Sequence, residues 1–152
     1  MDAKTIVLFK DLNVAFNRVR GAYALWAKEN QVGYHEMMVL YALQEGSCHT
    51  QRQICDQYLL PKQTINNIIS FLQAQGYLKL VSDTADRREK RLALTVSGQQ
   101  YADQLLMPLR RIEEAMLLQM NPDELQKMAD MVLRYGQILE NLTHDSRQEE
   151  SL

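Results

Sequence analysis

Apolar side chains recur every three or four positions along the first part of the chain. This spacing places them on one face of an α-helix, because residues three and four apart lie above one another. Turn-forming residues then cluster between Asn30 and Gly33. The pattern therefore predicts one long helix that ends near Asn30. Its repeating positions are Thr5, Leu8, Leu12, Ala15, Val19, Ala22 and Trp26.

Two shorter helices are predicted next. Residues 35–43 are apolar on nearly every face, which predicts a short, deeply buried helix. Thr50 and Gln53 form a capping-box pair, in which a hydroxyl and an amide three residues later satisfy the first N–H groups of a helix. That helix ends before Pro61, a residue favoured at the first position of the next helix.

The helix predicted for residues 61–75 has an unusual outer surface. Its spacing places Ile65, Ile69 and Leu72 on the buried side, with Ile68 beside them. The opposite side and its flanks consist of short amides and hydroxyls rather than the charged residues typical of a solvent-facing helix. These polar positions are Gln63, Thr64, Asn66, Asn67 and Ser70.

Residues 77–82 and 90–95 predict two short strands, and the charged residues 83–89 join them as a hairpin. A helical pattern resumes after this hairpin, and either Thr95 or Ser97 fits its N-terminal cap. Pro108 lies inside this helix and is expected to kink it. The sequence from Asn121 to Glu124 marks the start of a last helix.

The order of these elements predicts a winged helix-turn-helix over residues 34–97, so the fold class is mainly α with a small β-hairpin wing. Helical regions at residues 1–30 and 98–143 flank it, and the polar residues 144–152 are expected to form a flexible tail. The length of 152 residues fits one compact domain overall.

Charge is distributed unevenly along the chain. The formal net charge is −2, yet residues 49–91 carry seven basic and four acidic side chains, whereas the remainder carries ten and fifteen. The middle of the chain is therefore where an anionic partner would dock. No run of about 18 apolar residues occurs, which predicts no membrane span. With no targeting signal evident, a cytoplasmic location is expected.

These features together favour binding to double-stranded DNA. In a winged helix-turn-helix, the second helix of the turn enters the major groove, where amides and hydroxyls match donors and acceptors on base edges. We therefore predict that the polar face of residues 63–70 reads bases; Thr64, at the helix start, also suits a phosphate. Predicted contacts to the DNA backbone are Thr50, Gln51, Lys62, Arg87, Lys90 and Arg91. Arg88 is predicted to enter the minor groove, with Asp86 orienting it.

Two segments resemble the MarR family of bacterial transcriptional regulators. Residues 60–78 (LPKQTINNIISFLQAQGYL) are similar to the family's recognition helix and its exit through a glycine. The sequence DRR at 86–88, then LT at 94–95 and Gly98, is similar to the wing signature Asp-x-Arg and Leu-Thr-x-x-Gly. The resemblance implies a homodimer whose first and last two helices interleave. It also implies a pseudo-palindromic operator and repression that an effector relieves.

The effector is not identified by the sequence. The resemblance implies a crevice for a small aromatic or other apolar molecule, and no obligatory cofactor. Candidate crevice residues are Tyr23, Trp26, His35, Met38 and Tyr41, which fit ordinary core positions equally. Cys48 and Cys55 form no disulfide framework and fit either structural or redox-active thiols. The scattered histidines predict no metal site.

Two other classes of function compete with DNA binding, namely an enzyme and a protein-interaction dimer. The chain contains no nucleophile-and-base motif and no glycine-rich phosphate loop, so an enzyme is not predicted. A helical protein-interaction dimer with weak or lost DNA binding remains the alternative, because the chain as a whole is not basic.

Overall fold

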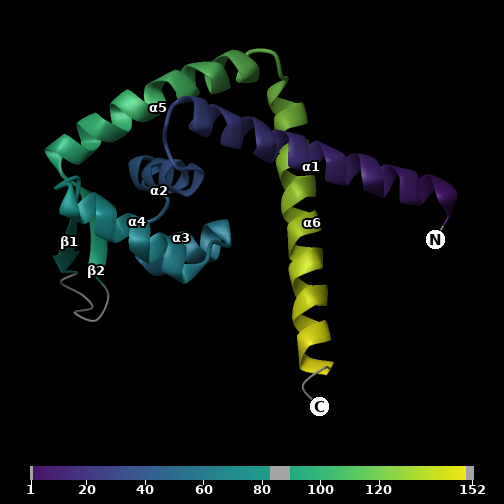
Figure 1. Cartoon of the computed structure of the whole chain (residues 1–152). Coiled ribbons are helices and arrows are strands. Elements are labelled where there is room, and N and C mark those ends of the chain that lie inside the picture. Colours follow the sequence, from purple (N-terminus) through teal and green to yellow (C-terminus); the bar gives the residue numbers. More distant parts are fainter. Residues whose placement is uncertain (1, 83–89, 150–152) are drawn as a thin grey trace. The chain divides into compact units, whose positions relative to one another are not determined.

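The computed structural model describes residues 2–82 and 90–149. These residues form six helices and two strands, which Figure 1 shows in chain order. The elements are α1 (Ala3–Glu29), α2 (Tyr34–Glu45), α3 (Gln51–Tyr58), α4 (Lys62–Ala74), β1 (Leu78–Ser82), β2 (Lys90–Leu94), α5 (Val96–Leu117) and α6 (Pro122–Glu149). The predicted fold class is confirmed. Contacts divide the chain into two compact units, residues 1–109 and 110–152.

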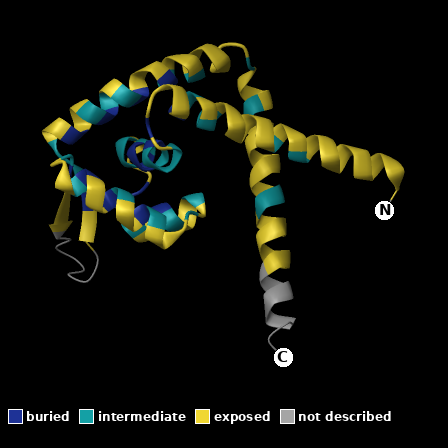
Figure 2. Ribbon diagram, in the orientation of Figure 1, coloured by how far each residue is buried: buried dark blue, intermediate teal, exposed yellow. Residues whose placement is uncertain are grey.

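The core of the first unit is built around α2, which contacts α1, α4 and β2. Every residue from Tyr34 to Gln44 is buried or half-buried, as Figure 2 shows for this helix. The side chains of Met37, Val39 and Leu40 are at most 1% exposed. The prediction of a short, buried helix is therefore confirmed. None of the described helices combines the length and the hydrophobicity needed to cross a bilayer.

The predicted start and stop signals of the helices are mostly confirmed. Both halves of the predicted capping box at Thr50 and Gln53 are present. Asp2, which is not among the predicted start signals, caps α1 by accepting a hydrogen bond from the Thr5 N–H at 2.6 Å. Helix α4 differs by one residue, because Pro61 keeps an extended backbone conformation (ψ 128°) and the helix begins at Lys62.

Strands β1 and β2 pair antiparallel, so that Leu78 lies opposite Leu94 and Leu80 opposite Leu92. The Leu78 and Leu92 side chains are buried and attach the wing, the hairpin formed by β1 and β2, to the core. The Leu92 N–H also donates to the carbonyl of His49 at 2.7 Å. The wing is thereby tied to the segment that precedes α3.

The start of α5 is fastened to the end of α4. Thr95 is the N-terminal cap, since its hydroxyl accepts from the Gly98 N–H at 3.0 Å. The same hydroxyl donates to the carbonyl of Gly76 at 2.6 Å. Gly98 lies so close to the chain at Tyr77 that a Cβ atom at this position would collide with the Tyr77 carbonyl group. Of the two caps that the sequence allowed, the structure selects Thr95.

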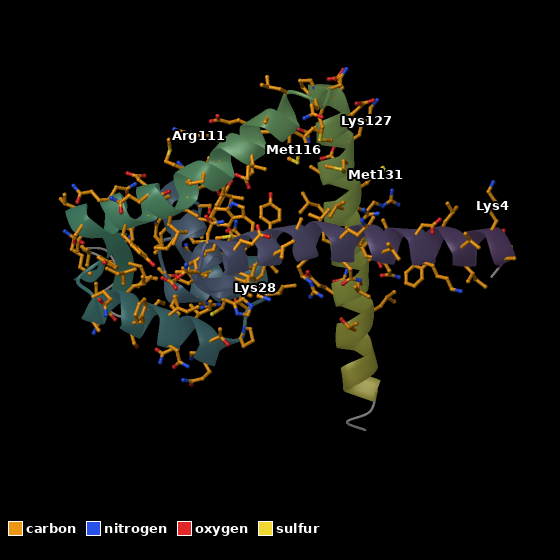
Figure 3. All side chains as sticks on the ribbon, turned by 45° about the horizontal axis from the view of Figure 1, so that its top comes forward. Lys4, Lys28, Arg111, Met116, Lys127 and Met131 are labelled. Carbon is orange, nitrogen blue, oxygen red and sulfur yellow. The ribbon has the colours of Figure 1, made fainter. Side chains whose placement is uncertain are left out.

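The second unit consists of the C-terminal part of α5 and the whole of α6. Asn121 caps the N-terminus of α6 as predicted, because its side-chain oxygen accepts a hydrogen bond from the Asp123 N–H at 2.9 Å. Figure 3 labels Met116 and Met131, exposed side chains on the two helical segments of this unit. Helix α6 extends to Glu149, well into the segment predicted to be a tail. The flexibility of that tail and the kink at Pro108 remain predictions.

Replacing Gly98 with alanine tests the fastening of α5 to the wing root. The added methyl group meets backbone rather than a movable side chain, so we expect Gly98→Ala to lower the free energy of unfolding by about 1–3 kcal/mol, the usual cost of overpacking. Urea unfolding followed by circular dichroism measures the change. The matched control is Gly21→Ala in α1, where nothing lies within 4 Å of the added atom. A variant at Gly98 as stable as this control would contradict the close approach.

Candidate nucleic-acid interface

Helices α3 and α4 form the helix-turn-helix. Leu59 ends α3 in the left-handed backbone region (φ 49°), which reverses the chain within a short turn. Such a conformation costs a non-glycine residue about 1–3 kcal/mol and persists where surrounding contacts hold it. One such contact is the Gln51 side-chain amide, which donates to the carbonyl of Lys62 at 3.4 Å. The first turns of the two helices are thereby joined.

Helix α4 buries one side and exposes the amide side, as its spacing predicted. Ile65, Ile69 and Leu72 are at most 4% exposed, and Ile68 is half-buried. The polar positions Gln63, Asn66, Asn67 and Ser70 are exposed to solvent. Thr64 differs from the other candidates, because it is half-buried and faces the N-terminal turn of α2.

Two of the exposed amide side chains, those of Gln63 and Asn67, are hydrogen-bonded to each other. The Gln63 side-chain N–H donates to the Asn67 side-chain oxygen at 2.9 Å, one helical turn away. This hydrogen bond restricts the rotamers of both side chains before any partner arrives, so less conformational entropy is lost when they bind. It also directs the remaining N–H groups of Asn67 and the carbonyl oxygen of Gln63 toward other partners.

The predicted backbone contacts are found in different surroundings. Lys62, Lys90 and Arg91 are exposed, and Gln51 is half-buried. Thr50 is only 6% exposed and its hydroxyl accepts from the Gln53 N–H in the capping box. The hydroxyl hydrogen is not used by this cap and Thr50 lines the cavity described next, so its contact with a phosphate stays a prediction. The remaining wing candidates, Asp86, Arg87 and Arg88, lie outside the described residues.

The residues of α3, α4 and the wing line one cavity of about 820 Å³. Gln51, Lys62, Asn66 and Lys90 all lie along it, so the structure brings predicted contacts from three separate elements to one concave surface. Both lysines give this surface the positive charge that an approaching phosphate backbone needs. The exposed Arg52–Asp56 pair at 3.5 Å also lines it, but surface ion pairs of this kind contribute little to stability.

A second recess of about 420 Å³ lies on the other flank of α4, against the first turn of α2. Of the five predicted crevice residues, His35 alone lines this recess; Tyr23, Trp26, Met38 and Tyr41 pack against the core instead. The remaining lining residues are Gly33, Tyr34, Glu36, Thr64, Asn67, Ile68 and Phe71. Sequence reasoning missed Phe71, although an exposed aromatic side chain away from the apolar stripe of α4 was a detectable signal.

The two cysteines lie in different surroundings. Cys48 is buried and its S–H donates to the Gln57 side-chain oxygen at 3.0 Å. Burial raises the pKa of Cys55, as does the nearby Asp56, which lowers the fraction of reactive thiolate. Within the described part of the chain, no three His, Cys, Asp or Glu side chains are grouped as metal ligands.

Comparison with known proteins tests the predicted family resemblance. Residues 31–89 match the sequence profile of the MarR family. The chain is 26% identical over 126 residues to the HTH-type transcriptional repressor NicR of Pseudomonas putida, covering 78% of this chain and 80% of NicR. The predicted resemblance to the MarR family is confirmed over residues 31–89. This is the family that the recognition helix and wing motifs predicted, and its members are transcriptional regulators.

Solved structures agree with the fold of this MarR-family regulator. NMB1585, a MarR family regulator from Neisseria meningitidis, is similar with a TM-score of 0.81 at 22% identity, covering 91% of this chain and 98% of that one. BpsR of Bordetella bronchiseptica, whose DNA binding is regulated by 6-hydroxynicotinic acid, is similar with a TM-score of 0.61 at 19% identity. That match covers 82% of this chain and 89% of BpsR. These likenesses concern the fold.

Proposed function

We propose that this MarR-family regulator is a sequence-specific repressor that binds double-stranded DNA as a homodimer on a pseudo-palindromic operator. The observation that carries the proposal is the exposed amide face of α4 beside the basic cavity that α3, α4 and the wing share. A solvated surface helix does not require amides fixed against each other or lysines from two elements at one concave surface. Base reading in the major groove uses both.

The two kinds of contact have different tasks in this proposal. Gln63, Asn66 and Asn67 read base edges, since amides supply a donor and an acceptor together. Lys62 and Lys90 hold phosphates on either side and set the position of α4 in the groove. Arg88, oriented by Asp86, reaches the minor groove from the tip of the wing.

The second copy in the proposed dimer covers the apolar faces of the long helices. Helix α1 exposes Leu8 at 59% and Val19 at 61%, and α6 exposes Met131 at 72% and Leu142 at 62%. Figure 2 shows exposure along most of both helices. Continuous apolar faces of this kind mark interaction surfaces, and closed two-fold pairing of identical chains is the commonest way to cover them. The family resemblance favours the same partner.

The recess between α2 and α4 is the proposed effector site, and an aromatic carboxylate is the proposed ligand class. Tyr34 and Phe71 supply apolar walls, and His35 and Thr64 supply polar groups. The first turn of α2 lines the recess, and the positive end of a helix dipole favours a carboxylate there. A volume of about 420 Å³ falls within the usual range for small ligands. The regulation of BpsR by 6-hydroxynicotinic acid supports this class.

The salt dependence of binding tests the proposal. Affinity for a bound duplex should fall steeply as salt rises, because neutralised phosphates release counterions. Lys62→Ala should reduce the slope of log affinity against log salt by about 1. Lys4→Ala, at the far end of α1 in Figure 3, should leave the slope unchanged. Affinity that is absent or independent of salt would contradict DNA binding and favour the protein-interaction dimer.

The division of tasks predicts different losses for different variants. Asn67→Ala should relax base choice in the major groove, with a cost of about 1–3 kcal/mol on the preferred site. Arg88→Ala should weaken binding most on sites with A·T-rich flanks, where the narrow minor groove attracts arginine. Competition binding with matched and substituted duplexes measures both effects. Equal, sequence-independent losses for the two variants would refute this assignment.

A further inference from the structure

One wall of the α2–α4 recess is connected to α5. Glu36 lines the recess, and its carboxylate accepts a hydrogen bond from the Tyr101 hydroxyl at 2.9 Å. Tyr101 lies 65 positions further along the chain, in the second turn of α5. Burial first, and then the Glu36 carboxylate, raise the pKa of Tyr101 to about 12. The hydroxyl therefore stays protonated, and a donor, at physiological pH.

The other side of Tyr101 is connected to the root of the wing. Its ring stacks on the ring of Tyr77, with centroids 4.4 Å apart and planes 12° from parallel. Stacked aromatic pairs stabilise a contact beyond the area that they bury. The hydroxyl of Tyr101 thus contacts Glu36 in the recess, and its ring contacts Tyr77 at the root of the wing.

Tyr77 in turn is held at the junction between α4 and β1. Its N–H donates to the carbonyl of Leu72 at 2.9 Å, and its carbonyl accepts from the Thr95 N–H at 3.0 Å. Gly98 packs directly against the same carbonyl group. A displacement of Tyr77 therefore acts on the end of the DNA-reading helix and on the first strand of the wing together.

We propose that Tyr101 is a positioning residue that couples the recess to the DNA-reading surface, through its hydrogen bond to Glu36 and its stacking on Tyr77. This inference rests on the proposed effector site. An aromatic carboxylate bound at the first turn of α2 brings a second negative charge near Glu36, and like charges repel. The carboxylate of Glu36 relieves that repulsion by turning away from the recess, and this movement alters its hydrogen bond to Tyr101.

A second contact between α2 and α5 does not involve the recess. The Gln44 side-chain amide donates to the Asp103 carboxylate at 2.7 Å. This bond keeps α5 attached to α2 while the bond between Tyr101 and Glu36 changes. The bond between Gln44 and Asp103 holds α5 at one point, while the bond between Glu36 and Tyr101 changes at another. A small movement of Glu36 can therefore shift α5 relative to the wing root.

The coupling is tested first without DNA or ligand, on the full-length protein. Hydrogen exchange is measured at the Tyr77 and Thr95 amides, whose hydrogen bonds hold the wing root. Tyr101→Phe and Glu36→Ala should each speed exchange there by about 2- to 10-fold, the effect of one lost hydrogen bond. The double variant should exchange no faster than the single ones, because both changes remove the same bond. Additive effects, or no effect, would overturn the connection.

The second measurement uses 6-hydroxynicotinate as the probe, with a duplex that the wild-type protein binds. Tyr101→Phe should bind the probe with wild-type affinity but should no longer release DNA in response to it. Glu36→Gln removes the negative charge and keeps an acceptor for Tyr101, so it should bind the probe about 5-fold tighter and also lose the response. Tyr58→Phe, which removes another partly buried tyrosine hydroxyl near Ser47, is the matched control and should respond as wild type does.

The outcomes separate this inference from the proposed function. A Tyr101→Phe protein that releases DNA as the wild type does would overturn the inference. If 6-hydroxynicotinate neither binds nor releases DNA from the wild type, the proposed ligand class fails. The exchange measurement alone then decides whether Tyr101 links Glu36 to the wing root. Circular dichroism melting of each variant distinguishes a lost response from a lost fold.

Discussion

The junction at Gly76 and Tyr77 is the contact on which the arrangement of α4, the wing and α5 depends. Helix α4 ends there, β1 begins there, and α5 is fastened there by Thr95 and Gly98. Helix α4, strand β1 and helix α5 therefore meet at this one backbone segment. Because a Cβ atom at Gly98 has no room, the approach of α5 to the junction is set by backbone against backbone rather than by adjustable side chains. The orientation of the wing relative to α4 follows from this contact.

The rest of the chain has a different physical character. The first unit has a compact core around α2, whereas most of α1 and α6 is exposed and rich in apolar side chains. A small helix-turn-helix core cannot cover these faces. This contrast explains why DNA reading and association with a second copy are assigned to different parts of the same chain. Helix α5 belongs to both units, because it continues past Leu109, where the first unit ends.

Periodicity and capping chemistry predicted the elements well, because both are local. The capping box at Thr50, the buried face of α4 and the hairpin pairing depend on residues close in sequence. The recess depends on how α2 meets α4, which no local pattern encodes; of the five predicted crevice residues His35 lines it, and the other four are partly buried against the core. The two uses of the Thr50 hydroxyl, as a cap and as a phosphate contact, could not be separated by spacing, because a hydroxyl accepts and donates at once. The four-residue spacing of Gln63 and Asn67 was compatible with their hydrogen bond, whereas the proposed role of Tyr101 depends on contacts between helices that no local pattern encodes.

Selection of bound duplexes from random DNA by the full-length protein tests the central claim most directly. A homodimer that inserts two copies of α4 into successive major grooves should enrich a pseudo-palindrome with half-sites one helical turn apart, about 34–36 Å. Enrichment of such a site, with A·T-rich positions where the wings reach the minor groove, is the predicted result. Recovery of no enriched sequence, or of a single half-site without a symmetric partner, would contradict it.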